Sequence, residues 1–246
     1  LALFLCRHFL PDEWPARKTL FCIIGGGILL RALFCFLHPP SNDLYRYIFE
    51  GYVQTQGINP FIHGPQELFA TYGTGPMASI AEQINHPELS AAYPPLSQLL
   101  FRITAWISPT VPAFKLLMAG ADCFALILLG LWAHKRSIPL KNLLFYAANP
   151  LILAYLSGEA HLDALQVLAL SATLYMFGSK RTALAFLVLG CAILFKYFAV
   201  IFVPFFLNRH NARHAPLLLV PALSVLPFLD AGTSLFASLS TFGTQM

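Results

Sequence analysis

The segment Leu20–Leu37 reads LFCIIGGGILLRALFCFL, and it decides the kind of fold that this chain can form. It follows the basic pair Arg17 and Lys18 and is almost continuously apolar. A helix that crosses a membrane needs about 20 mainly apolar residues, so this segment is a candidate span. Ala113–Trp132 is a second candidate of the same kind. The two segments predict a helical protein that crosses a lipid bilayer more than once.

The composition of the whole chain supports this interpretation. Of its 246 residues, 57% are hydrophobic and 11% are charged, and its mean hydropathy is +0.66. A soluble domain carries about 25% charged residues, so an ordinary soluble enzyme is excluded, and the high hydrophobicity also excludes a disordered chain. The formal net charge of +4 comes from basic residues in short clusters between apolar segments. Such clusters orient membrane proteins, so we expect a lipid bilayer, and no nucleic acid, as a partner.

The basic clusters also predict how the apolar segments cross the bilayer. The positive-inside rule places them in the cytoplasm, so the long polar insert at residues 38–94 lies outside it. If Leu96–Ile107 and Ala113–Trp132 both crossed, Lys135 would lie outside as well. We therefore expect Leu96–Ile107 to stay at the outer interface or to enter the bilayer only partly. The remaining apolar runs are Leu143–Leu156, expected to run outward, Leu162–Phe177, expected to return, Thr182–Leu207, and Leu217–Leu229.

The segment Thr182–Leu207 leaves two alternatives, because Lys196 stands near its middle. As one helix, it would bury this lysine near the bilayer centre at a cost of about 3 kcal/mol. As two shorter legs, it would place Lys196 at an external turn, although each leg is then too short to span. Both alternatives leave Lys196 in need of an anionic partner. Asp122, inside Ala113–Trp132, is another charge in an apolar segment for which the sequence names no partner.

The densest group of polar residues follows the first candidate span. Asp43, Arg46, Tyr47 and Glu50 are spaced so that all four share one face of a helix. On that face Asp43 is suited to accept a proton from an attacking hydroxyl, and Arg46 is suited to bind a phosphate. The alternative is an amphipathic helix whose polar face is merely wet and whose Arg46 pairs internally with Glu50.

Two further motifs lie in the polar insert. Asn59 belongs to GINPF at residues 57–61, a pattern typical of a simple turn. His86 belongs to INHP at residues 84–87, and Tyr93 begins YPPL at residues 93–96. These two side chains either contact a sugar or anchor the chain at the membrane interface.

A last group, Glu159, His161 and Asp163, lies at a short turn between apolar segments, on the same expected side as the insert. Three ionisable groups in such a place are costly unless they are used, so we expect them to bind sugar hydroxyls. The alternative is a solvated turn in which Asp163 caps the next helix. A divalent metal needs more ligands than this turn offers, so we assign no metal site.

Taken in order, these motifs resemble those of bacterial integral-membrane glycosyltransferases. The order is NDLYRY at 42–47, GINPF, INHP, YPPL and then LFK at 194–196. The chain is similar to the GT-C superfamily, in particular the polyprenyl-phosphate-mannose-dependent mannosyltransferases of glycosyltransferase family 87. The resemblance implies an all-α, polytopic transmembrane helix bundle with a long extracytoplasmic first loop that carries short interfacial helices. It also implies a single domain over residues 1–246, incomplete because relatives continue further, with the catalytic loop at residues 38–94.

The resemblance implies a reaction as well. A hexose, most simply mannose, would move from a polyprenyl-phosphate sugar donor to a glycan or glycolipid acceptor, on the extracytoplasmic face of the bacterial plasma membrane. Asp43 would be the general base, without a cofactor or a metal; many relatives carry a second acid where this chain has Asn42. Arg46 and Lys196 would ease the charge of the departing lipid phosphate. The residues expected to bind donor or substrate are Arg46, Tyr47, Glu50, Asn59, His86, Tyr93, Glu159, His161, Asp163 and Lys196.

Two other functions remain as alternatives at this point. A transporter or flippase of lipid-linked sugars would share the apolar grooves and the cation in an apolar segment. A non-catalytic membrane scaffold would use the polar insert to bind a partner. A flippase does not need an external carboxylate beside an aromatic-rich loop, which favours the glycosyltransferase.

Overall fold

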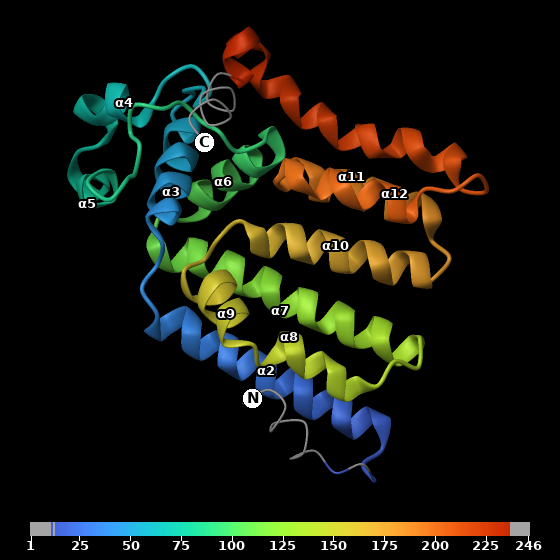
Figure 1. Ribbon diagram of the computed structural model, residues 1–246. Helices are drawn as coiled ribbons and strands as arrows, with labels where there is room; N and C mark the ends of the chain where they lie inside the picture. The colour runs from blue at the N-terminus through green and yellow to red at the C-terminus, as the bar shows by residue number, and fades with distance from the viewer. Residues whose placement is uncertain (1–10, 12, 237–246) are drawn as a thin grey trace.

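The computed structural model describes residue 11 and residues 13–236. Every regular element in this part of the chain is a helix, and Figure 1 shows a row of long helices with a group of short ones at one end. The expected all-α membrane bundle is confirmed. The long helices, in the order in which each packs on the next, are α2 (Ala16–Leu37), α7 (Val111–Lys135), α10 (Asp163–Gly178), α11 (Thr182–Phe195) and η5 (Ala212–Phe236).

Three of the described helices, α2, α7 and η5, are long and apolar enough to cross a membrane. Their apolar surface points largely outward: in η5 only 11% of the most apolar stretch is buried inside the protein, and in α2 only 22%. Outward side chains such as Phe21 and Phe36 on α2 would expose a large apolar area to water. A bilayer removes that cost, so the exposed apolar faces indicate lipid contact.

The run Leu143–Leu156, expected to be one leg, is instead broken, and this expectation is wrong. Pro150 has no backbone N–H to continue a helix, and the side chain of Asn149 accepts a hydrogen bond from the N–H of Leu151 and starts a new one. The chain then winds into a π-helix and meets α10 at an angle of 113°. The short elements before α10 are η2 (Leu140–Leu143), α8 (Leu144–Ala147), α9 (Pro150–Ile152) and the π-helix η3 (Leu153–Gly158).

The segment Thr182–Leu207 forms two legs, and the alternative of one continuous helix is wrong. Helix α11 ends before Lys196, whose backbone is extended (φ −155°, ψ 119°). The second leg consists of η4 (Tyr197–Phe202) and α12 (Val203–Phe206). Ala192 of the first leg and Ala199 of the second belong to one buried cluster, so the two legs fold back on each other.

The short helices lie within and after the polar insert. Helix α6 (Pro95–Ile107) has 13 residues and is about 20 Å long, which is less than the roughly 30 Å of a hydrocarbon core. It packs against α3 (Asn42–Thr55) so closely that a Cβ at Gly51 would collide with the carbonyl group of Phe101. The remaining short helices of the insert are α4 (Pro65–Tyr72), η1 (Gly75–Met77) and α5 (Ala78–Ala81), as expected for residues 38–94.

Charges separate along the bundle. The basic pair Arg17 and Lys18 lies at the start of α2, and Lys135 ends α7 beside the end of α10, where its Nζ donates to the hydroxyl of Ser179 at 2.8 Å. These three helix termini lie at the end of the row opposite to α3 and α6 in Figure 1. The acidic and aromatic motifs of the insert therefore lie at one end of the bundle, and this basic group lies at the other.

Candidate functional site

A cavity of about 560 Å³ opens at the end of the bundle that carries α3. It lies where three segments meet: the first turns of α3, the loop before α6, and the break between α11 and η4. These segments are far apart in sequence, so the fold brings the separate motifs together. The residues that line the cavity are Asp43, Arg46, Asn85, His86, Ala92, Tyr93, Pro94, Lys196, Tyr197 and Phe198.

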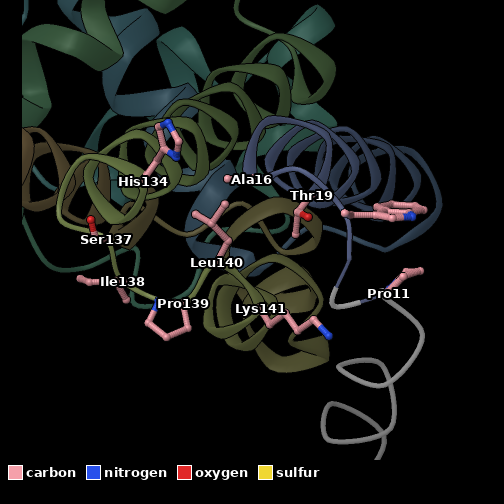
Figure 2. A pocket seen from close by; sticks show the side chains of 10 residues that line it. Pro11, Ala16, Thr19, His134, Ser137, Ile138, Pro139, Leu140 and Lys141 are labelled. Carbon is pink, nitrogen blue, oxygen red and sulfur yellow. The ribbon is translucent and has the colours of Figure 1, made fainter.

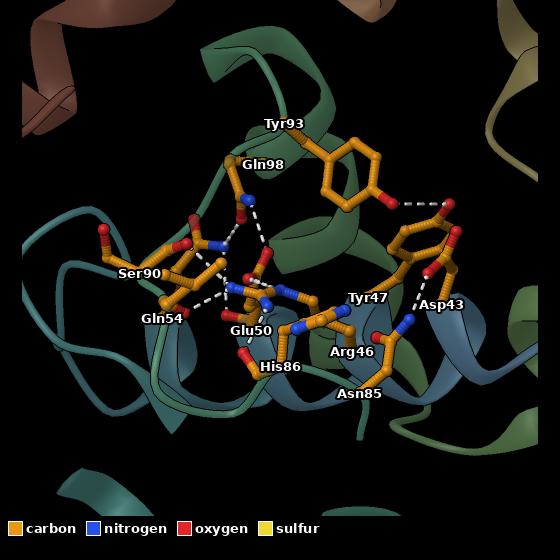
Figure 3. Close-up of polar contacts among 11 residues, drawn as sticks. Asp43, Arg46, Tyr47, Glu50, Gln54, Asn85, His86, Ser90, Tyr93 and Gln98 are labelled. Carbon is orange, nitrogen blue, oxygen red and sulfur yellow. Dashed lines mark hydrogen bonds and ion pairs between the residues drawn. The ribbon is translucent and has the colours of Figure 1, made fainter. Parts of the chain in front are cut away.

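Asp43 is the carboxylate of this cavity. It lies in the first turn of α3, where the helix dipole favours a negative charge. Nδ2 of Asn85 donates to its Oδ1 at 3.1 Å, and Nδ1 of His161 lies 3.7 Å from its Oδ2. The side chain remains 31% exposed, so it is oriented by its neighbours while still open to the cavity, as Figure 3 shows for Asp43 and Asn85.

Arg46 and Glu50 form a buried ion pair, with Nε 2.7 Å from Oε1 (Figure 3). The rest of the guanidinium donates to backbone carbonyls, at 3.0 Å to His86, 2.5 Å to Leu89 and 2.7 Å to Ser90. The internal pair that the sequence left as an alternative is therefore the arrangement found. Most donors of Arg46 are engaged with the protein itself, and they fix the loop that carries Asn85 against α3.

Glu50 is held from its other side as well, and it does not line the cavity. Nε2 of Gln98 donates to Oε2 of Glu50 at 2.6 Å, and Gln54 donates to the side chain of Gln98 at 2.9 Å. This buried network ties α3 to α6. Glu50 is thus a structural counterion for Arg46 in this arrangement.

Tyr47 and Tyr93 form an aromatic wall beside Asp43. The hydroxyl of Tyr47 donates to that of Tyr93 at 3.3 Å, and its ring stacks on Phe101 with centroids 4.6 Å apart. Burial raises the pKa of both phenols above the usual value, and the nearby negative charge of Asp43 raises it further. Both groups stay protonated at neutral pH, so they can offer hydrogen bonds but not act as bases.

The turn after η3 brings its ionisable residues to the start of α3. The N–H of Ser41 donates to the carbonyl of Glu159 at 3.0 Å, which fixes the turn there. The ring of His161 stacks on Tyr155, and its Nε2 lies 3.0 Å from Oε2 of Glu159. Ala160 takes up the left-handed backbone that this tight turn requires (φ 62°). His161 is thereby placed between two carboxylates, those of Glu159 and Asp43.

Lys196 finds the anionic partner that the sequence requires. Its Nζ donates to both carboxylate oxygens of Asp163, each at 2.8 Å. The amide of Gln166 donates to the backbone carbonyl of Lys196 at 2.8 Å, which stabilises the break after α11. Asp163 makes no side-chain cap of α10, so the capping alternative is not the one found. The lysine side chain is 41% exposed and lines the same cavity as Asp43.

The chain is similar to a known protein family over most of its length. Residues 33–210 match the model of the alpha-(1->6)-mannopyranosyltransferase family, N-terminal domain. The chain belongs to this family. It is therefore a glycosyltransferase of the mannosyltransferase kind, and the resemblance inferred from the motifs is confirmed. No curated protein and no solved structure matches the chain.

All the expected site residues of this mannosyltransferase lie inside the matched region. Those that line the cavity are Asp43, Arg46, His86, Tyr93 and Lys196, and those that do not are Tyr47, Glu50, Asn59, Glu159, His161 and Asp163. Asn59 does not line the cavity: its Oδ1 accepts from the N–H of Phe61, and its Nδ2 donates to Asp230 at 2.6 Å. The side chain of His86 is 62% exposed and lies 3.5 Å from Glu88. His86 lines the cavity, and its backbone carbonyl accepts a hydrogen bond from Arg46.

Two residues that hold the site of this mannosyltransferase, Asn85 and Gln98, were not predicted from the sequence. Asn85 stands next to His86 in the INHP motif, and its amide is the group that orients Asp43. Gln98 follows the YPPL motif by two positions and holds Glu50. Both are amides beside motifs that the sequence had singled out, and that proximity was the available signal.

The structure also supplies the missing partner of Asp122. Arg31 of α2, fully buried, lies with Nε 3.0 Å from Oδ2 of Asp122, and its Nη2 donates to Oδ1 at 3.1 Å. The hydroxyls of Tyr146 and Ser157 donate to the same carboxylate at 2.6 and 2.8 Å. This group, called the Asp122 cluster below, joins α2, α7, α8 and the π-helix η3 inside the bundle.

A second cavity of the mannosyltransferase, of about 490 Å³, lies at the basic end of the bundle, between the start of α2 and the chain after α7 (Figure 2). His134 and Lys141 line it, and none of the described residues that line it is an aspartate or glutamate. In the part of the chain that the structure describes, no three His, Cys, Asp or Glu side chains are arranged to hold a metal ion.

Proposed function

We propose that this mannosyltransferase moves a mannosyl group from polyprenyl-phosphate mannose to a hydroxyl group of a glycan or glycolipid, with Asp43 as the general base. The proposal extends to an α-(1→6) linkage, in accord with the name of the family. The single observation that carries it is the shared cavity, whose wall presents the carboxylate of Asp43 and the ammonium of Lys196. Transfer from a phosphate ester needs both charges, one to activate the acceptor and one to receive the phosphate.

In the proposed step, Asp43 accepts the proton of the acceptor hydroxyl while the hydroxyl oxygen bonds to the anomeric carbon of the donor. The bond between that carbon and the phosphate oxygen breaks at the same time, and the phosphate departs with the electron pair. Asn85 holds one oxygen of Asp43, which leaves the carboxylate oriented toward the cavity. A single displacement inverts the anomeric centre, so an α-linked product requires a β-linked donor.

Lys196 is the proposed phosphate ligand. Without a donor its ammonium pairs with Asp163, and it remains exposed enough to contact a phosphate at the same time. Arg46, which the sequence suggested for this role, is instead proposed as a positioning residue, because its guanidinium holds the loop at residues 86–90. Tyr93 offers a sugar an aromatic surface and a hydroxyl, and Nδ1 of His161 lies 3.7 Å from Oδ2 of Asp43.

The separation of charge along the bundle supports a location for the site. Basic residues that flank α2 and α7 lie at one end, where the positive-inside rule expects the cytoplasm. The cavity with Asp43 lies at the opposite end. We therefore propose a multi-pass protein of the bacterial plasma membrane whose active site faces away from the cytoplasm.

The test is transfer of labelled mannose from polyprenyl-phosphate mannose in membranes that contain the protein. Asp43→Asn keeps the size of the side chain and removes the base, so we expect a loss of transfer of about 10²- to 10⁴-fold. The matched control is Glu67→Gln, an exposed acid of α4 that pairs with His63 and does not line the cavity; it should transfer normally. Normal transfer by Asp43→Asn, at equal amounts of inserted protein, would remove Asp43 from the mechanism.

A further inference from the structure

The cavity of about 490 Å³ near the start of α2 lies at the opposite end of the bundle from Asp43. We call it the basic cavity. The first turn of α2 forms one side of it, and the chain after α7 forms the other (Figure 2). Polar side chains on its wall that can contact an anion are Thr19, His134, Ser137 and Lys141.

Positive charge is concentrated around the basic cavity. Three segments meet at this end of the bundle: residues 11–19, 134–141 and 178–181. Together they carry seven lysine or arginine residues against two acids. Nζ of Lys18 lies 4.1 Å from the ring centre of Trp14, which lines the cavity and is a residue type common where a membrane meets water. Basic pockets between membrane helices are suited to the anionic head groups of lipids.

An apolar groove of about 300 Å³ lies on the same helices, next to the basic cavity along the chain. Thr19 of α2 lines the basic cavity, and Ile23 and Gly26, on the same face of that helix, line the groove. On the facing side, Lys141 lines the basic cavity and Leu144, at the start of α8, lines the groove. We call it the α2–α8 groove.

The length of the α2–α8 groove fits one leaflet of a bilayer. From Thr19 to Leu30, the last residue of α2 that lines the groove, the helix rises about 17 Å, and half of a hydrocarbon core measures about 15 Å. Leu29, on the groove wall, is 61% exposed, whereas Ile23 and Ala147 are buried and close the groove toward the bundle. The groove therefore opens toward lipid.

We propose that the basic cavity and the α2–α8 groove together bind one anionic phospholipid from the leaflet at the basic end of the bundle. Its phosphate group lies in the basic cavity, and one acyl chain lies in the groove. A phospholipid joins an anionic head to an apolar chain in the order in which the two surfaces follow each other. Free phosphate would leave the groove unfilled, and the cationic head of phosphatidylcholine is disfavoured by the surrounding positive charge. The site is separate from that of the proposed function, at the other end of the bundle.

The binding test uses the full chain, purified in detergent, and phosphatidylglycerol that carries a photoreactive diazirine in the middle of one acyl chain. We expect covalent labelling within residues 22–30 and 144–148. Unlabelled phosphatidylglycerol should prevent the labelling at a lower concentration than phosphatidylcholine with the same acyl chains. Inorganic phosphate at the concentration of the lipid should not prevent it. Labelling confined to other segments, equal competition by phosphatidylcholine, or prevention by inorganic phosphate would each overturn the proposal.

The head group is tested by Lys141→Gln, and the matched control is Arg136→Gln. The control removes the same charge at the same end of the bundle, but Arg136 is exposed and does not line the basic cavity. A basic residue near the membrane surface contributes about fivefold to the binding of an anionic lipid, so Lys141→Gln should lower the affinity for phosphatidylglycerol by about fivefold. Arg136→Gln should have a smaller effect. Equal effects of the two variants would contradict a defined head-group site.

The groove is tested by Gly26→Leu, and the matched control is Gly25→Leu. A Cβ at either position meets no atom within 4 Å, so both variants fit the helix, but only Gly26 lines the groove. Each buried methylene contributes roughly fourfold in affinity, so excluding two of them should weaken phosphatidylglycerol binding about tenfold in Gly26→Leu. Gly25→Leu should bind as the unmodified protein does, and equal affinities of the two variants would rule out the groove. Should Gly26→Leu fail to fold, the position of labelling in the unmodified protein decides.

Discussion

The Asp122 cluster allows a prediction of stability from its geometry. Arg31 and Asp122 are both fully buried, and their charges compensate each other within the bundle. Removing one partner leaves the other charge buried and unpaired, which costs about 3–5 kcal/mol. We therefore expect Asp122→Leu and Arg31→Met, each alone, to lower the free energy of unfolding by this amount.

The double variant Arg31→Met with Asp122→Leu should be more stable than either single variant. It removes both charges, leaves the hydroxyls of Tyr146 and Ser157 without their acceptor, and removes the donor of Arg31 from the carbonyls of Gly27 and Ala147. Two neutral hydroxyls that lose a hydrogen bond cost about 1–2 kcal/mol each, and local rearrangement toward nearby carbonyls reduces this. Recovery of at least 1 kcal/mol relative to the worse single variant is the expected result.

The assay is unfolding in mixed micelles by titration with SDS, followed by tryptophan fluorescence. A matched control is Leu29→Met on α2, whose side chain is 61% exposed and which should change the free energy of unfolding by less than about 0.5 kcal/mol. If Asp122→Leu costs less than about 1 kcal/mol, the two charges are not buried together as described. If the double variant loses as much as both single variants added, the charges do not act as a pair.

Two other predictions concern the cavity. Lys196→Gln should reduce mannose transfer by about 10²-fold, measured as the initial rate with labelled donor. The double variant Lys196→Gln with Asp163→Asn should not recover transfer, because the phosphate would still lack its cation. Recovery in the double variant would show that Lys196 serves only to neutralise Asp163. Tyr47 and Tyr93 should show no phenolate absorbance in the folded protein at about pH 10, where a free phenol is half ionised, because their pKa values are raised. The unfolded chain releases such protons from about pH 10, so unfolding releases protons there and the free energy of unfolding falls as pH rises above that value. A phenolate signal from these two residues near pH 10, detected by comparison with their Phe variants, would contradict their burial beside Asp43.

Local sequence patterns predicted the parts of the fold that depend on local properties. The spans α2 and α7 follow from length and hydropathy, and the shared face of Asp43 and Arg46 follows from helical spacing. The break at Asn149-Pro150 also has a local signal, because proline removes a backbone hydrogen-bond donor. The apolar run around it nevertheless predicted a single helical leg.

The contacts that define the site depend instead on long-range packing. Asp122 meets Arg31 from 91 positions away, and Asp43 meets Asn85 from 42 positions away. No periodicity relates such residues. The partners of Arg46 could not be predicted for another reason. Most of its acceptors are backbone carbonyls of a loop, and every residue type has such a carbonyl, so the sequence does not mark them.

The π-helical winding of η3 makes the site tolerant of a change in the length of the chain. A π-helix holds more residues in each turn than an α-helix, so η3 has room for a residue that an α-helix would not accommodate. Deleting one residue from Leu153–Gly158 would let the remaining five wind as an α-helix, which turns the chain through nearly the same angle as the six residues of the π-helix. His161 would then still face Asp43, whereas the same deletion from an ordinary α-helix would turn the following residues by about 100°. A difference of one residue in length is therefore absorbed at this point of the chain.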